Sequence, residues 1–422
     1  MSMDALAASL YDQILQIPLI DPHTHINPLR PASRSLDDIL GYHYYTELAH
    51  SAGMSKEPLG ANVDPRERVR AILGHMDRYS NTVQYAWFLE IARTFLGFQG
   101  HRLGVSDATW LCDQAEKLMA QPDWEQQVLI RSNLEQVFLT NEFDDPLEGF
   151  DTQRYVPCLR TDDLVFKLDH PGVRERLARA TQVDVGDAAT ARRAVTALFE
   201  HFTRKNARAC AISLPPDFSP LPVSEQELTR ALNTQGSDEQ AARIRARGLF
   251  WILADHCRSF RLPFDLMIGV NRRVYVEGVF QGQDLFDSRL SLIQYAELFN
   301  AFPTVPFCIS VLSSGLNQEL VSYAWIFPNV ITSGHWWYAN IPAFIESDLQ
   351  ARLEAVPRTK QIGYYSDMYK LEFALPKYNM YRRVLARVLA ERFIRTGLMT
   401  EKEALDVARH LLRGNVQSIF GV

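Results

Sequence analysis

The sequence of 422 residues lacks the features that mark secreted, membrane and nucleic-acid-binding proteins. Its five cysteines lie far apart without a Cys-x-x-Cys pair, which excludes a dense disulfide framework and predicts buried thiols in a reducing cytosol. No apolar run approaches the roughly 20 residues of a membrane helix, and no basic segment precedes an apolar one at the N-terminus. We therefore expect a cytoplasmic protein with no membrane partner.

Charge of one sign is also scarce. The formal net charge is -6, and lysine and arginine are spread along the chain, so no basic patch predicts a nucleic acid or an anionic lipid as partner. With 47% hydrophobic and 22% charged residues, the chain can instead bury a sizeable core. A small-molecule substrate is the better expectation.

Short apolar runs, rich in β-branched or aromatic residues, alternate with segments of helical period, which is typical of parallel βα units. The runs cover residues 18–25, 135–140, 154–160, 207–214, 263–270, 306–312, 330–337 and 359–367. Eight such runs predict an α/β fold, a (β/α)8 TIM barrel with its site at the carboxyl ends of the strands. A doubly wound sheet is the alternative, but no Gly-x-Gly-x-x-Gly turn follows the first run.

A long stretch separates the first run from the second, and its pattern predicts helices. Segments of helical period cover 35–51, 64–77, 81–95, 106–119 and 123–132, several of them opening with an N-cap residue. We predict an N-terminal helix and first strand in 1–33, a helical insertion in 34–133 and the rest of the barrel in 134–422. The insertion is either a lid over the catalytic mouth or a packing element, and it is compatible with a homo-oligomer.

Two histidines end the first run, in the string Asp21-Pro22-His23-Thr24-His25. Strand alternation places His23 and His25 on one face, where two imidazoles suit Zn²⁺ or another borderline divalent metal. Two core histidines are the alternative reading of so short a motif, but the end of a barrel strand favours a metal site.

Asp367 ends the eighth run, which neighbours the first in a closed barrel. Its carboxylate could bind the ion or act beside it as a general base. The alternative is an N-cap for the following helix.

Several further short motifs occur in a characteristic order. They are His43-Tyr44, Leu159-Arg160-Thr161-Asp162, Trp336-Trp337-Tyr338 and Ser366-Asp367 followed by Tyr381-Arg382-Arg383. With the histidine pair, they make the sequence resemble the uronate isomerase (glucuronate isomerase) family of the amidohydrolase superfamily over most of its length.

The resemblance implies roles for eight residues. They are a metal site of His23, His25 and Asp367, active-site residues His43 and Tyr44 from the insertion, a substrate-contacting Arg160, and Trp336 and Trp337 flanking the substrate. An arginine can hold a carboxylate with two hydrogen bonds, and a tryptophan face can pack against a sugar. The alternatives are a core position for both tryptophans, a structural ion pair between Arg160 and Asp162, and a satisfied helix histidine at His43.

The sequence departs from the family pattern at three places. Met267 replaces a histidine expected at the fifth strand, and a thioether is a poor ligand for such a cation. Glu47 is one of the residues that replace basic ones after His43-Tyr44, and Tyr369 replaces an arginine. A substrate carboxylate would then depend on Arg160, with help from Arg30 or Arg34.

We expect an aldose–ketose isomerase that acts on a hexuronate, D-glucuronate or D-galacturonate, with a divalent metal, most simply Zn²⁺, and no organic cofactor. Asp367, His43 and Tyr44 would move a proton between C2 and C1 through an enediol. One alternative is a metal-dependent hydrolase of a sugar-acid lactone, ester or amide. It is opposed by the absence of histidine and lysine from runs 207–214, 263–270 and 306–312. The other alternative is a catalytically impaired relative that binds a sugar acid without turnover.

Overall fold

The structure is a computed structural model that describes residues 4–234 and 238–422. A parallel strand lies in each of the eight predicted runs, usually shorter than the run itself. The strands are β1 (Leu19–Asp21), β2 (Leu134–Phe138), β3 (Asn141–Glu142), β4 (Tyr155–Val156), β5 (Cys158–Arg160), β6 (Ala209–Leu214), β7 (Phe264–Ile268), β10 (Phe307–Val311), β11 (Val330–Ser333) and β12 (Gln361–Ile362).

The strands close into the predicted barrel. They pair in the orders β1-β2-β4 and β12-β11-β10-β7-β6-β5-β3. The two ladders continue each other because β2 leads directly into β3, and only Pro157, which has no N–H to donate, separates β4 from β5. Backbone hydrogen bonds between the loops after β1 and β12 complete the circle, from Asp367 N to His23 O (3.2 Å) and from His25 N to Met368 O (2.8 Å). The doubly wound alternative is wrong.

The middle strands show how the barrel is filled. Every residue of β7 is buried, as expected for a parallel strand covered on both faces. Phe264, Leu266 and Ile268 pack in the layer between the strands and the surrounding helices, whereas Met267 belongs to a different apolar cluster with Tyr365. Strand alternation therefore turns Met267, and with it Asp265, into the barrel.

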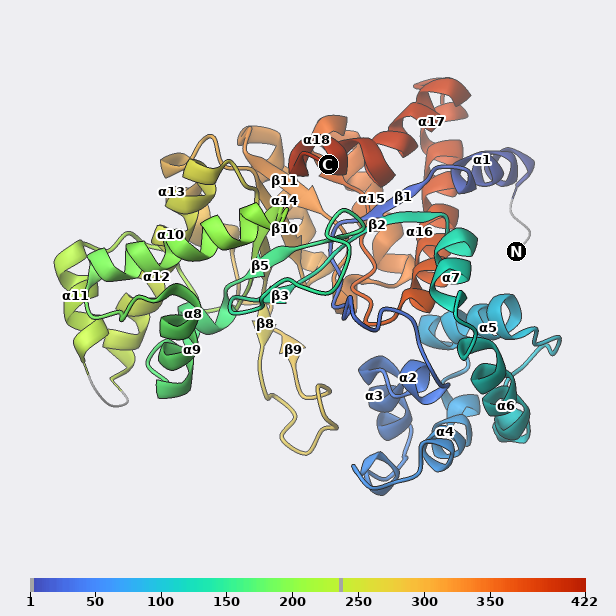
Figure 1. Cartoon of the computed structure of the whole chain (residues 1–422). Helices are drawn as coiled ribbons and strands as arrows, with labels where there is room; N and C mark the ends of the chain where they lie inside the picture. The colour runs from blue at the N-terminus through green and yellow to red at the C-terminus, as the bar shows by residue number, and fades with distance from the viewer. Residues whose placement is uncertain (1–3, 235–237) are drawn as a thin grey trace.

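Helices surround the strands (Figure 1). They are α1 (Ala5–Leu15), α8 (Asp162–Phe166), α9 (Pro171–Thr181), α10 (Ala188–Arg204), α11 (Glu225–Asn233), α12 (Glu239–Phe260), α13 (Ala296–Ala301), α14 (Asn317–Ile326), α15 (Pro342–Ala355), α16 (Ala374–Val388), α17 (Glu401–Arg409) and α18 (Asn415–Phe420). Within the described residues, no helix combines the length and the apolar character that crossing a membrane requires. All five cysteines are buried and free, as predicted.

The predicted insertion is helical. It contains α2 (Asp37–Leu40), α3 (His43–Ser51), α4 (Pro65–Leu73), α5 (Val83–Leu96), α6 (Ala108–Met119) and α7 (Trp124–Ser132). The single helix predicted over 35–51 is wrong, because Gly41 ends α2 and Tyr42 is extended, so that α3 begins at His43. Residues of α3, α5 and α16 share one hydrophobic cluster. The division of the chain at residues 33 and 133 stays a prediction.

A hairpin that the sequence did not reveal follows β7. Strands β8 (Val270–Asn271) and β9 (Leu285–Phe286) pair antiparallel, and the hairpin lies on the same side of the barrel as α2–α4 (Figure 1). Lys56 Nζ lies 3.0 Å from Glu277 Oε2, and the Tyr338 hydroxyl donates to Asp284 O over 2.7 Å. These contacts join the hairpin to the insertion and to the loop after β11.

Candidate metal centre and active site

Three predicted metal ligands meet where β1 and β12 end. The candidate ligand atoms of His23, His25 and Asp367 all lie within 4.8 Å of one another. Asp367 Oδ1 is 3.2 Å from His25 Nε2 and 3.7 Å from His23 Nε2. Two ligands of one tetrahedral Zn²⁺ lie roughly 3.4 Å apart, so these separations suit a shared ion.

The other ring nitrogen of each histidine is anchored. His23 Nδ1 lies 3.2 Å from Asp265 Oδ2, and His25 Nδ1 lies 2.8 Å from Thr140 Oγ1. Because the Thr140 hydroxyl donates to Thr24 O (3.0 Å), it accepts from His25 Nδ1. Both imidazoles therefore carry their proton on Nδ1 and present the Nε2 lone pair, the form that binds a metal.

Unsatisfied atoms support the same interpretation. Within the described parts of the chain, His23 Nε2 and Asp367 Oδ1 are buried and have no hydrogen-bond partner, a costly arrangement that a cation would relieve. Burial raises the pKa of Asp367, but the closeness of His25, His23 and Lys377 outweighs burial and brings this pKa down to about 2. The carboxylate is therefore ionised at neutral pH, and the donor set fits a divalent cation.

The backbone at Asp367 is strained. Its φ of 54° lies in the left-handed region, which costs a non-glycine residue roughly 1 kcal/mol or more. Asp367 is not an N-cap, because the next helical turn begins only at Leu371, so this alternative is wrong. Hydrogen bonds fix the strained segment, from Ser366 N to Asp21 Oδ1 (3.0 Å) and from the Tyr42 hydroxyl to Asp367 O (3.0 Å).

The insertion contributes His43 and Tyr44 to this place from the first turn of α3. The Tyr44 hydroxyl donates to Asp367 Oδ2 over 3.3 Å, which leaves Oδ1 for a cation. His43 lies between the rings of Tyr369 and Trp337, at centroid distances of 5.6 and 5.8 Å. Its buried Nδ1 has no hydrogen-bond partner among the described residues, so a satisfied helix histidine is the wrong reading.

Burial decides the protonation of both insertion residues. It lowers the pKa of His43 to about 3 and raises the pKa of Tyr44 well above its usual value. At neutral pH His43 is a neutral imidazole that can accept a proton, and Tyr44 keeps its phenolic proton.

The two tryptophans have different surroundings. Trp336 is buried in an apolar cluster with Met267, Leu312 and Tyr365, as the core alternative expects. Trp337 is half-buried, and its ring lies 5.8 Å from that of His43. Of the pair, Trp337 is the one placed against the active-site residues of the insertion.

Arg160 ends β5 in an acidic setting. Its Nε lies 3.2 Å from Asp162 Oδ2 and its Nη1 3.5 Å from Glu142 Oε1, so the structural ion pair forms. The same guanidinium is close enough to act on His25 and Tyr369. Burial lowers the pKa of His25 and Arg160 adds to this effect, whereas burial raises the pKa of Tyr369 and Arg160 partly opposes the rise. Arg160 therefore lies at the edge of the site, whereas Arg30 and Arg34 are exposed.

Three residues that sequence reasoning missed support the site. Asp265 is a lone carboxylate in an apolar strand, and Thr140 ends the second run, so both carried a signal. Lys377 is fully buried in α16 beside the loop that carries Asp367. Nothing in the helical pattern distinguishes it from a surface lysine.

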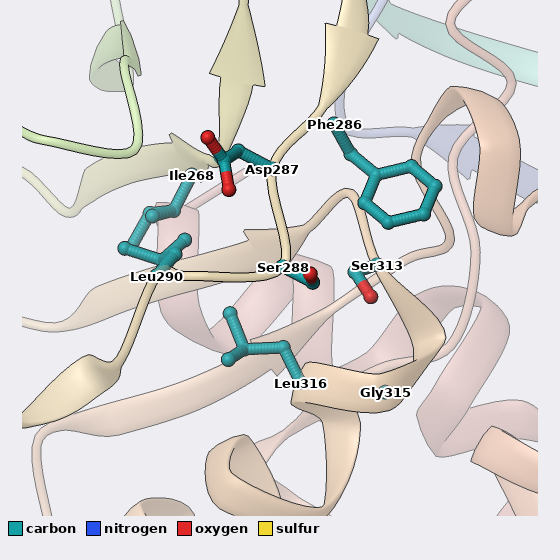
Figure 2. Close-up of a pocket in the computed structure, with 9 residues that line it drawn as sticks. Ile268, Phe286, Asp287, Ser288, Leu290, Ser313, Gly315 and Leu316 are labelled. Carbon is teal, nitrogen blue, oxygen red and sulfur yellow. The ribbon is translucent and has the colours of Figure 1, made fainter.

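A cavity of about 230 Å³ lies beyond the ends of β7 and β10 (Figure 2). It is lined by Ile268, Gly269, Phe286, Asp287, Ser288, Leu290, Ser313, Gly315 and Leu316. Phe286, Asp287 and Ser288 come from the hairpin side, and Ser313 to Leu316 from the loop after β10 (Figure 2). None of the eight predicted site residues lines it.

Known proteins resemble this chain over its whole length. Uronate isomerases from Nostoc punctiforme and Thermotoga petrophila are 24% and 21% identical to it, each over 98% of this chain and over 95% and 97% of their own lengths. Among solved structures, a uronate isomerase from Thermotoga maritima superposes with a TM-score of 0.91 at 19% identity, covering 99% of this chain and 98% of its own.

A glucuronate isomerase from Caulobacter crescentus superposes with a TM-score of 0.89 at 20% identity, covering 99% of this chain and 94% of its own. These structures share the fold. The sequence profile of the glucuronate isomerase family matches residues 1–256, more than half of the chain. The chain therefore belongs to the glucuronate isomerase family.

Proposed function

We propose that this protein is a uronate isomerase that interconverts a hexuronate, D-glucuronate or D-galacturonate, and its keto form. The observation that carries the proposal is the convergence of three candidate ligand atoms, from His23, His25 and Asp367, beside proton-transfer groups from the insertion. Family membership supplies the substrate class.

His23, His25 and Asp367 would hold a divalent cation, for which we propose Zn²⁺ because it accepts two imidazoles and a carboxylate. When bound, such a cation polarises and orients the oxygens at C1 and C2 of an open-chain sugar acid.

The reaction moves one proton from C2 to C1, while the carbonyl passes from C1 to C2 through an enediol. Asp367, as an anion, and His43, as a neutral imidazole, can accept the C2 proton, and the Tyr44 hydroxyl can donate to a developing oxyanion. Arg160 would bind the substrate carboxylate either in place of Asp162 and Glu142 or together with them, and the Trp337 face would pack against the sugar.

The buried free cysteines support a cytoplasmic location.

The test compares wild type with Asp367→Asn, using Asp406→Asn as a control because Asp406 pairs with Arg358 before the start of β12, whereas Asp367 lies beyond its end. Metal content is measured first, and conversion of both hexuronates is then followed by NMR. We expect turnover in wild type and in the control, and a loss of at least about 100-fold in Asp367→Asn. Full activity in Asp367→Asn would contradict the assignment.

A further inference from the structure

A buried lysine that no step of the proposed reaction uses lies behind the metal site. Lys377 is 0% exposed, and its ammonium has no carboxylate partner within 4.0 Å among the residues that the structure describes. Burying an unpaired cation costs several kcal/mol unless other groups replace water. The surroundings of Lys377 must therefore provide that replacement.

Four aromatic rings surround the ammonium. Its Nζ lies 4.9 to 5.9 Å from the ring centroids of Trp87, Tyr44, Tyr42 and Phe373. At such distances each ring face attracts a cation by about 0.5 to 2 kcal/mol. Three of these rings belong to the insertion, so the ammonium joins the insertion to α16.

The hydrogen bonds of Lys377 lead to the segment that carries a metal ligand. Nζ donates to Ser366 O over 2.7 Å and lies 3.5 Å from the Tyr42 hydroxyl oxygen. That hydroxyl in turn donates to Asp367 O over 3.0 Å. Lys377 thus holds the carbonyl of Ser366 directly and the carbonyl of Asp367 through the Tyr42 hydroxyl.

Asp367 needs such a restraint because its φ of 54° is unfavourable for a residue with a side chain. A strained conformation persists only where the surroundings over-determine it. We propose that Lys377 is a positioning residue, which fixes the Ser366-Asp367 backbone so that Asp367 Oδ1 points to the same place as His23 Nε2 and His25 Nε2. Lys377 touches neither the ion nor the substrate.

This inference rests on the proposed metal site, and the experiment separates the two. Zn²⁺ affinity is measured by competition with a chelator for wild type, Lys377→Met and Lys360→Met. Lys360 is the matched control, because its Nζ also donates to a backbone carbonyl, Phe327 O at 2.7 Å, but at the start of β12 rather than beyond its end. The folded state of each variant is checked by circular dichroism.

We expect Lys377→Met to bind Zn²⁺ about 10- to 100-fold more weakly, in the range found when groups that orient metal ligands are removed. Its kcat should fall while KM stays within about twofold, and Lys360→Met should match wild type. The direction of the change is informative. Removing a positive charge near a cation would by itself strengthen binding, so weaker binding indicates lost positioning.

Suppose that wild type binds Zn²⁺ and that folded Lys377→Met binds it equally or more tightly. This result would overturn the inference and leave the proposed function intact. Wild type that binds no Zn²⁺ would overturn both. If Lys377→Met does not fold, Tyr42→Phe decides, because it keeps the ring and removes only the hydroxyl between Lys377 and Asp367 O. Tyr42→Phe must then bind Zn²⁺ more weakly than wild type, and equal affinity overturns the inference.

Discussion

At the scale of single residues, the site depends on groups that hold the candidate metal ligands in place. Asp265 and Thr140 fix the tautomers of His23 and His25, and Tyr44 occupies one oxygen of Asp367 so that the other is free. Met267, which stands where a further ligand was expected, packs against Trp336 and Tyr365 instead. Three ligands held in this way need rigid support more than four ligands would.

Asp265→Asn tests that support. An asparagine can turn its NH2 group toward His23 Nδ1 and so favour the wrong tautomer, with the proton on Nε2. We expect Zn²⁺ affinity to fall by about 10- to 100-fold, as measured by chelator competition. Affinity equal to wild type would show that the bond from His23 to Asp265 does not orient the ligand.

Glu47 makes stability depend on pH. Burial, with a smaller contribution from Asp284, raises the pKa of Glu47 from 4.5 to about 8. The native state therefore binds a proton more tightly than the unfolded state does, so the free energy of unfolding falls as pH rises from about 4.5 to about 8. Glu47→Gln removes this dependence.

The measurement is urea denaturation at pH 5 and pH 8, with a chelator present throughout. Relative to wild type, Glu47→Gln should gain stability at pH 8, by on the order of 1 kcal/mol after allowance for partial exposure. If the difference between the two proteins is the same at both pH values, Glu47 does not titrate in this range.

At the scale of elements, the ends of β11 and β12 are fitted to each other. Gly334, with φ of +46°, follows β11, and a Cβ there would lie 2.2 Å from the Tyr365 ring. That ring in turn packs against His23 at a centroid distance of 5.2 Å. Any side chain at Gly334 would displace Tyr365, which packs against the candidate ligand His23.

Gly334→Ala should therefore lower the free energy of unfolding by about 1 to 3 kcal/mol through overpacking, and weaken Zn²⁺ binding as well. Gly97→Ala is the control, because Gly97 is also left-handed, at φ +78°, but has open space around it. That control should lose only about 1 kcal/mol and keep its Zn²⁺ affinity. Equal behaviour of the two variants would contradict the packing argument.

Elements with a strong periodic signal could be predicted, and those set by local geometry could not. All eight barrel strands and most insertion helices follow from apolar periodicity. The break at Gly41 and the hairpin of β8 and β9 were missed, because one depends on the conformation of a single residue and the other has only two residues in each strand. The same limit applies to Lys377, whose burial only the packed structure shows.

At the scale of the whole molecule, the insertion and the barrel are joined through buried polar contacts. Glu372 is 0% exposed and accepts hydrogen bonds from Ser33 N (2.9 Å), Ser33 Oγ (3.0 Å) and Trp124 Nε1 (2.7 Å). It connects the loop after β1 and helix α7 of the insertion to the segment after β12. The loop after β1, the insertion and the segment after β12 also carry the candidate metal ligands, His43 and Tyr44.

Glu372→Gln should weaken that connection. A glutamine offers one accepting oxygen in place of two and turns an NH2 group toward donors, which costs about 1 to 3 kcal/mol in a buried site. Chemical denaturation should show one shifted transition, with Glu401→Gln at the start of α17 as an unaffected control. A separate early transition in the variant would show that the insertion unfolds independently of the barrel.

The order of motifs along the chain predicted which residues meet at the barrel mouth, because strand order fixes which strand ends are neighbours. For Arg160 the sequence offered a substrate contact and, as the alternative, a structural ion pair with Asp162, but it did not reveal the second contact, with Glu142. The structure shows Arg160 in contact with Asp162 and Glu142, so recognition of a substrate carboxylate requires a change of partners. The contact with Glu142 depends on the pairing of β3 with β5, which no local pattern encodes.

The central claim is that a metal site of His23, His25 and Asp367 supports isomerisation of a hexuronate. The most direct measurement is NMR of Zn²⁺-loaded wild type with D-glucuronate and with D-galacturonate in D2O. We expect a keto product from at least one of them, with deuterium at C1 to the extent that the transferred proton exchanges with solvent. Zn²⁺-loaded protein that converts neither hexuronate would contradict it.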